Sequence, residues 1–132
     1  MDISFEKLSY SFHDKPLLIG GKAMEYYGLR PVGADIDLVV SSIDHELLCK
    51  RYPGHIKDLY GDIGICEYGF EIWNQICRFN YDYLRQGAIE EEDILVISME
   101  KLLFLKTLAI EHEKYHRDVL LLVKEILRRQ YE

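Results

Sequence analysis

The chain has 132 residues, of which 48% are hydrophobic and 30% charged, and this composition predicts one compact domain rather than two. Its formal net charge of −7 argues against non-specific DNA binding, because neutralising phosphates requires a basic surface. No apolar run is long enough for a secretory leader or a membrane span, so the sequence predicts neither. The three cysteines Cys49, Cys66 and Cys77 form no CxxC pair, which indicates a reducing, cytoplasmic compartment.

The N-terminal third predicts a strand, a glycine turn and a helix. The first ten residues suggest a short amphipathic helix. Residues 16–19 form a brief apolar run that ends at Gly20-Gly21, and apolar residues then recur at helical spacing until Gly28. Residues 35–41 alternate acidic and apolar side chains before a β-branched end, which predicts a second, partly buried strand.

The remaining elements are predicted from caps, turns and apolar runs. Ser42 or Asp44 is expected to cap a helix that reaches about Tyr52, and residues 63–67 and 70–76 are expected to form a hairpin. The acidic run 90–93 is expected to be a solvated loop or a frayed helix end. Two helices are expected after it. The first runs from a Ser98 cap to about 111, and the second, over 117–129, is apolar enough to pack on more than one side.

Asp35 and Asp37 are the first candidate site residues. In a strand, a spacing of two residues places both carboxylates on one face. There they repel each other unless a cation lies between them. Oxygen ligands in that arrangement suit Mg²⁺, which usually also takes phosphate oxygens from a substrate. Glu71 is an acid between apolar residues in a later strand, and it supplies a third carboxylate if that strand lies beside the first. Glu67 and Asp62 are alternatives for the third position.

Gly20-Gly21 is the second candidate feature. A glycine pair between a strand and a helix lets the backbone approach a phosphate closely, with unpaired helix N–H groups nearby. Residues 101–132 hold 7 basic and 5 acidic residues, against 9 and 18 in residues 1–100, so an anionic ligand would fit between the tail and the acidic body.

The segment LLIGGKAMEYYGLRPVGADIDLVVS, residues 17–41, resembles the nucleotidyltransferase fold superfamily, and its pattern is closest to the small bacterial members of the AbiEii type. The resemblance implies an α+β chain: a mixed β-sheet flanked by helices, with a sheet-containing core over 1–97 and two C-terminal helices over 98–132 packed on it as one domain. It also implies two divalent ions, Mg²⁺ or Mn²⁺, on Asp35 and Asp37 with Glu71. Weaker similarity covers Leu105 to Ala109 and Arg117-Asp118.

From the resemblance, the expected activity is transfer of a nucleoside monophosphate from an NTP, with ATP the first candidate, to a hydroxyl. Asp35, Asp37 and Glu71 would be the catalytic and metal-binding residues. Phosphate contacts would come from five residues, namely Gly20, Gly21, Lys22, Lys106 and Arg117. The acceptor is left open between a tRNA end, a protein hydroxyl and a small molecule, and a second copy or a partner protein would help complete so small a site.

Two departures favour a non-catalytic alternative. The family often has Ser or Thr two positions before the first aspartate, where this chain has Gly33, and a further acid three residues after Asp118, where it has Leu121. Either change is compatible with a regulatory protein of the toxin–antitoxin kind that keeps the fold without turnover. For Lys106 a solvent-facing position, and for Asp118 a helix-capping role, are the simpler interpretations.

His112-Glu113-Lys114-Tyr115-His116 spells His-Glu-x-x-His, the pattern of zinc hydrolases, which needs a continuous helix to bring both imidazoles to the metal. Lys114 and Arg117 are poorly suited to a helix buried against a metal site. The stretch is therefore expected to be a polar turn between two helices, with zinc hydrolysis as the lesser alternative.

Overall fold

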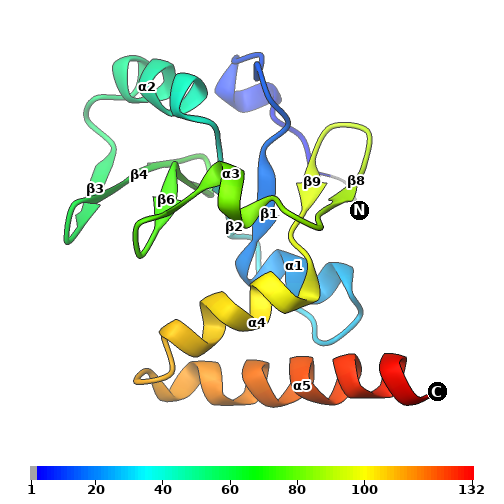
Figure 1. Ribbon diagram of the computed structural model, residues 1–132. Helices are drawn as coiled ribbons and strands as arrows, with labels where there is room; N and C mark the ends of the chain where they lie inside the picture. Colours follow the sequence, from blue (N-terminus) through cyan, green and yellow to red (C-terminus); the bar gives the residue numbers. More distant parts are fainter. Residues whose placement is uncertain (1–2) are drawn as a thin grey trace.

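A seven-stranded mixed sheet lies at the centre of the molecule, with α2 on one side and α4 and α5 on the other (Figure 1). The computed structural model describes residues 3–132. In chain order the elements are η1 (Glu6–Leu8), β1 (Leu17–Ile19), α1 (Gly20–Tyr26), β2 (Ile36–Val39), α2 (Ser42–Arg51), β3 (Ile56–Leu59), β4 (Asp62–Glu67), β5 (Phe70–Trp73), β6 (Gln75–Ile76), β7 (Phe79–Asn80), α3 (Tyr81–Leu84), β8 (Ile89–Glu90), β9 (Leu95–Val96), α4 (Met99–Leu108), η2 (Glu113–Tyr115) and α5 (His116–Tyr131). The expected mixed sheet flanked by helices is confirmed.

The strand order places the two acid-bearing strands side by side. The sheet runs β3-β4-β5-β2-β1-β9-β8, while β6 and β7 form a separate small sheet. β2 is antiparallel to β1 and parallel to β5, and the register sets Asp37 opposite Ile19 on one side and Glu71 on the other. β5, which carries Glu71, therefore lies directly beside β2, which carries Asp37, as the role of Glu71 as a third carboxylate requires.

The two faces of β2 have different roles, as its period of two requires. Leu38 is fully buried on one face, in the same row as Ile72 of β5. Asp37 lies on the opposite face, where α4 covers the sheet and Leu102 shares a recess with Asp37 and Trp73. α5 in turn packs on α4 as the outermost layer (Figure 1). The acid row thus lies between the sheet and the first C-terminal helix.

The N-terminal segment is anchored to α2 by one buried carboxylate. Asp44 is inaccessible to solvent and accepts hydrogen bonds from the Tyr10 hydroxyl at 2.6 Å and from the backbone N–H groups of His13 at 2.9 Å and Asp14 at 3.1 Å. Ser41, rather than Ser42 or Asp44, caps α2, because its side chain accepts from the Asp44 N–H. The helix expected in the first ten residues is only the 3₁₀ turn η1.

Several boundaries differ from the sequence-based expectation. β3 was not expected, because all four of its residues are exposed and it shows no alternation. β5 ends at Trp73 rather than 76. Ile89–Glu90 form the edge strand β8, so the acidic run is not wholly a loop. α4 ends at Leu108, three residues before the expected end.

The last helix is buried on one face only, not on several. Along α5 only Asp118 and Leu122 are buried, whereas Leu120 is 53% and Leu127 is 50% exposed. The number of apolar residues in this helix therefore predicts more burial than the structure shows. Within residues 3–132 no helix combines the length and apolarity that crossing a bilayer requires.

Ser98 sets the start of α4, because its side chain accepts a hydrogen bond from the Lys101 N–H at 3.1 Å. We expect Ser98→Ala to lower the free energy of unfolding by about 1 kcal/mol, the usual cost of losing a cap. Urea unfolding followed by circular dichroism measures this. Ser42→Ala is the matched control, since Ser42 occupies the first turn of α2 without being its cap. An equal loss in both variants would contradict the capping role.

Candidate functional site at the β1, β2 and β5 strands

The glycine turn and the central aspartate are in direct contact. Gly20 follows β1 and has a φ of +65°, a conformation that glycine adopts without strain. A Cβ at this position would collide with the Asp37 Oδ2 atom. Position 20 therefore favours glycine, both for its backbone angle and for the space that the carboxylate occupies. The glycine turn therefore meets Asp37, the second aspartate of the pair.

Glu71 lies beside Asp37 and connects two recesses. Asp37, Glu71 and Gly20 line a pocket of about 200 Å³ between the sheet and α4, whose other walls are largely apolar. Asp35 and Glu71 line a second pocket, of about 310 Å³, at the β4–β5 turn. The three predicted carboxylates thus gather along one edge of the β2–β5 pair, with Glu71 shared by both recesses.

The carboxyl group of Asp37 is held in an environment that disfavours its charge. Burial, the largest cause, and the neighbouring carboxylates of Glu71 and Asp35 together raise its pKa to about 6, while Lys106 and Lys57 act in the opposite direction. A cation placed among these acids would remove the repulsion. The electrostatics are those of a site that gains from binding a metal ion or a proton.

Lys106 is buried, not solvent-facing. Only 6% of its surface is exposed, and its ammonium lies 2.9 Å from Asp118 Oδ2 and 4.9 Å from the centre of the Tyr115 ring. Arg30 completes the cluster with two bonds to the same carboxylate, at 2.6 and 2.8 Å. Although burial opposes ionisation of Asp118, the hydrogen bonds from Arg30 and Lys106 hold its pKa below the usual value.

This cluster corrects two expectations. Asp118 does not cap α5 with its side chain; it fixes Lys106 instead. Lys106 lines the same recess as Asp37 and Gly20, so the fixed ammonium lies at the wall of the candidate site. Arg30 was not foreseen, because nothing in the sequence near it indicates that it contacts a residue 88 positions away.

Three other predicted phosphate ligands have different surroundings. The Lys22 ammonium lies 3.3 Å from Glu25 on its own helix, and Arg117 is exposed at the start of α5. Neither is among the residues that line the recess beside Asp37. Gly21 packs closely on Val32, where an added Cβ would lie 3.0 Å from the Val32 Cγ1 atom. Of the basic residues predicted to contact phosphate, only Lys106 is brought to the acids.

The geometry also separates Glu71 from the two alternative third acids. Cys66, not Glu67, is the β4 residue opposite Glu71, and Glu67 pairs with His55 at 3.1 Å and does not line the recess beside Asp37. Asp62 lies at the far end of β4 and accepts from the Gln75 side chain at 2.8 Å. Glu71 is the acid beside Asp37.

The donor set fits a metal ion that arrives with a ligand. Among residues 3–132, no three histidine, cysteine, aspartate or glutamate side chains are grouped closely enough to hold an ion by themselves. Mg²⁺, however, is usually bound by one or two carboxylates, several waters and substrate phosphates. Asp37 and Glu71, adjacent in register and repelling each other, supply such a pair.

The His-Glu-x-x-His segment does not form the helix that a zinc site needs. His112 is extended, residues 113–115 form the 3₁₀ turn η2, and α5 begins at His116. The His116 Nε2 atom lies 2.8 Å from the Ile110 carbonyl oxygen, so this ring nitrogen already has a partner. The expected polar turn between two helices is confirmed.

Two residues at the site were missed in the sequence. Trp73 is 3% exposed and forms part of the recess floor beside Glu71. Lys57 of β3 lies with its ammonium 3.7 Å from Glu71 Oε2. The Tyr60-Gly61 pair, with φ values of 53° and 94°, is the turn signal from which the β3–β4 hairpin, and hence Lys57, was predictable.

Replacing Gly20 tests the contact with Asp37. We expect Gly20→Ala to destabilise the fold by about 1–2 kcal/mol, because alanine is strained at positive φ, and to displace the Asp37 carboxylate as well. Thermal unfolding measures the first effect. Gly33→Ala is the control, since a Cβ there would meet no atom within 4 Å. Equal stability of the two variants would argue against a tight approach at Gly20.

No protein-family model, curated protein or solved structure matches the chain.

Proposed function

We propose that the chain is a Mg²⁺-dependent nucleotidyltransferase that moves a nucleoside monophosphate from an NTP, with ATP the first candidate, to a hydroxyl. The observation that carries the proposal is the contact of Gly20 with Asp37, directly beside Glu71. This arrangement brings together the glycine turn, the second aspartate of the pair and the later strand acid that the resemblance implies. The fixed Lys106 ammonium at its wall adds a charge suited to phosphate.

In this proposal each group has a separate task. Asp37 and Glu71, completed by Asp35, would hold one or two Mg²⁺ or Mn²⁺ ions, which stabilise negative charge on the attacking and leaving oxygens. The backbone at Gly20 and Gly21 would contact phosphate oxygens, with Lys106 opposite. A carboxylate not occupied by metal, Glu71 first, would accept the proton of the acceptor hydroxyl.

The acceptor stays open between a tRNA end, a protein hydroxyl and a small molecule. The recess beside Asp37 has a volume of about 200 Å³, which is below the usual range for small-molecule sites. A second copy of the chain or a partner protein would therefore be needed to complete a site for both substrates. Cytoplasmic residence is part of the same proposal.

Binding is tested before turnover. A thermal-shift panel of ATP, CTP, GTP and UTP with Mg²⁺ or Mn²⁺ detects any ligand that binds the native state, because such a ligand raises stability in proportion to RT ln(1 + [L]/Kd). We expect the divalent ion alone to stabilise the protein weakly, and nucleotide together with the divalent ion to stabilise it most. If no nucleotide stabilises the protein, with or without a divalent ion, the result would favour the non-catalytic alternative. The Gly33 and Leu121 departures motivate that alternative.

Turnover is tested with α-labelled nucleotide. We expect Asp35→Asn and Asp37→Asn to reduce label transfer and pyrophosphate release at least about 100-fold, as loss of transition-state charge stabilisation does elsewhere. Glu46→Gln is the matched control, because that carboxylate is exposed on α2, pairs with Lys50 and lines neither recess. Undiminished transfer in Asp37→Asn would refute the assignment.

A further inference from the structure

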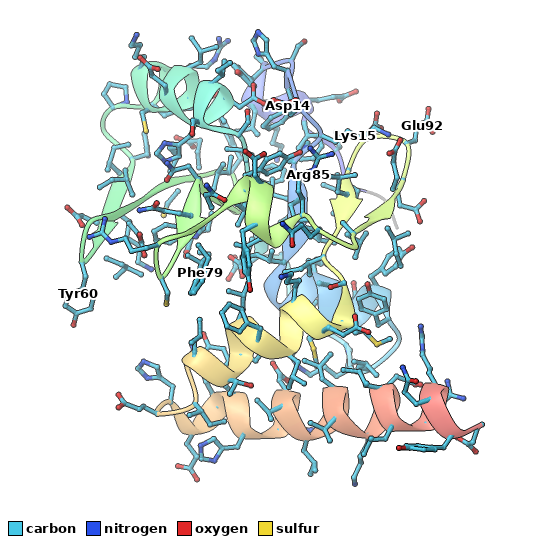
Figure 2. All side chains as sticks on the ribbon, in the orientation of Figure 1. Asp14, Lys15, Tyr60, Phe79, Arg85 and Glu92 are labelled. Carbon is cyan, nitrogen blue, oxygen red and sulfur yellow. The ribbon has the colours of Figure 1, made fainter. Side chains whose placement is uncertain are left out.

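Lys57 is a lysine at the carboxylate row that the proposed chemistry does not use. It lies on β3, the edge strand of the sheet, where every residue is exposed. From there its side chain extends past β4 to β5, and its ammonium comes within 3.7 Å of Glu71 Oε2. Tyr60, 98% exposed, marks the tip of the same β3–β4 hairpin and points away from the body (Figure 2).

Gly64 lies beside Lys57 on β4, the strand between those of Lys57 and Glu71. It is the register partner of Lys57 on one side and of Trp73 on the other. A Cβ at Gly64 would lie 2.9 Å from the Trp73 ring, so the absence of a side chain lets the indole pack there. The Trp73 ring therefore fills the place beside Lys57 that a side chain at position 64 would take.

The two lysines near Asp37 are held very differently. Lys106 is buried and bound to Asp118 at 2.9 Å, whereas the Lys57 side chain is 47% exposed and its distance to Glu71 exceeds that of a hydrogen bond. Both lower the pKa of Asp37, against the effects of burial and of Glu71. One ammonium is therefore a fixed part of the wall, and the other is free to leave.

We propose that Lys57 is a displaceable counterion: its ammonium balances Glu71 in the metal-free protein, yields that carboxylate to an incoming divalent cation, and then contacts the phosphates that the cation brings. The second half rests on the proposed function; the first does not. A divalent cation interacts with the acid row through two charges where the ammonium has one. Once displaced, a lysine on a flexible stem remains close enough to act as a point charge toward phosphate.

The proposal predicts opposite effects on two affinities. In Lys57→Met, we expect Mn²⁺ alone to bind about three- to tenfold more tightly. The variant loses both the ion pair that competes for Glu71 and the repulsion between the ammonium and the metal ion. A non-hydrolysable ATP analogue at saturating Mn²⁺ should bind about tenfold more weakly. Lys57→Arg should remain near the wild-type values in both measurements.

Isothermal titration calorimetry of the full chain provides both values. Lys50→Met is the matched control, an exposed lysine paired with Glu46 on α2, and should leave both affinities unchanged. Unchanged or weaker Mn²⁺ binding in Lys57→Met would overturn the proposal. Tighter Mn²⁺ binding together with no nucleotide binding by the wild type would support the counterion role and refute the proposed function, so the two failures are distinguishable.

Discussion

Asp118→Ala is expected to lower the free energy of unfolding by about 3–5 kcal/mol, the usual cost of removing one partner of a buried ion pair. The change leaves the Lys106 ammonium, whose side chain is 7% exposed, without the carboxylate 2.9 Å away. It also removes both Asp118 bonds from Arg30. A fall in Tm of about 10 to 20 °C should accompany the loss, measured by calorimetry.

Two comparison variants make this result specific. Glu46→Ala removes an exposed pair with Lys50, 3.4 Å apart, and should cost about 0.5 kcal/mol or less. The double change Lys106→Met with Asp118→Leu should lose less than Asp118→Ala alone, because it removes the stranded charge as well. A loss below about 1 kcal/mol in Asp118→Ala would show that the cluster does not bear on stability.

Asp37→Asn is expected to stabilise the metal-free protein by about 2–3 kcal/mol at pH 7.5, while it reduces the proposed activity at least about 100-fold. Burial and the neighbouring acids raise the pKa of Asp37 from 3.8 to about 6. Each pKa unit corresponds to about 1.4 kcal/mol, so this rise in pKa means that the ionised carboxylate destabilises the native state by about 2–3 kcal/mol. Asparagine has nearly the same shape without the charge.

The stabilisation by Asp37→Asn is expected to depend on pH. Because the native pKa of Asp37 lies above the unfolded value, the native state binds more protons between pH 4 and 6. The cost is therefore fully present above about pH 6 and is lost as the pH falls toward 4, where protonated aspartate and asparagine should be equally tolerated. Urea unfolding of both proteins with chelator at pH 4, 5, 6 and 7.5 measures the difference.

A destabilised Asp37→Asn at pH 7.5 would mean that the Asp37 carboxylate supports the fold rather than straining it. Asp62→Asn is the control, since Asp62 accepts hydrogen bonds from the Gln75 side chain and the Cys77 N–H. That variant should lose stability, because its carboxylate is satisfied in the native state.

Two Tyr-Gly turns differ in how clearly the residues around them predict a hairpin. Tyr68-Gly69 joins the two strands of the hairpin predicted over 63–67 and 70–76, and the β4–β5 pair confirms that hairpin. Tyr60-Gly61 makes a two-residue loop of the same kind in the β3–β4 pair, which the sequence analysis does not predict. The apolar residues beside Tyr68-Gly69 made that hairpin visible, whereas β3 is exposed throughout and carries no burial pattern.

The sequence by itself determined the local features of the site: a glycine turn after a strand, and aspartates that alternate with buried residues in the next. These follow from backbone freedom and from the period of a strand, which act within a few residues. Only the tertiary structure decided that Glu71 rather than Glu67 or Asp62 adjoins Asp37, that Lys106 is buried by Asp118 and Arg30, and that Lys57 faces the acids. Strand order and helix packing bring together residues far apart in the chain, and no local pattern encodes those partners.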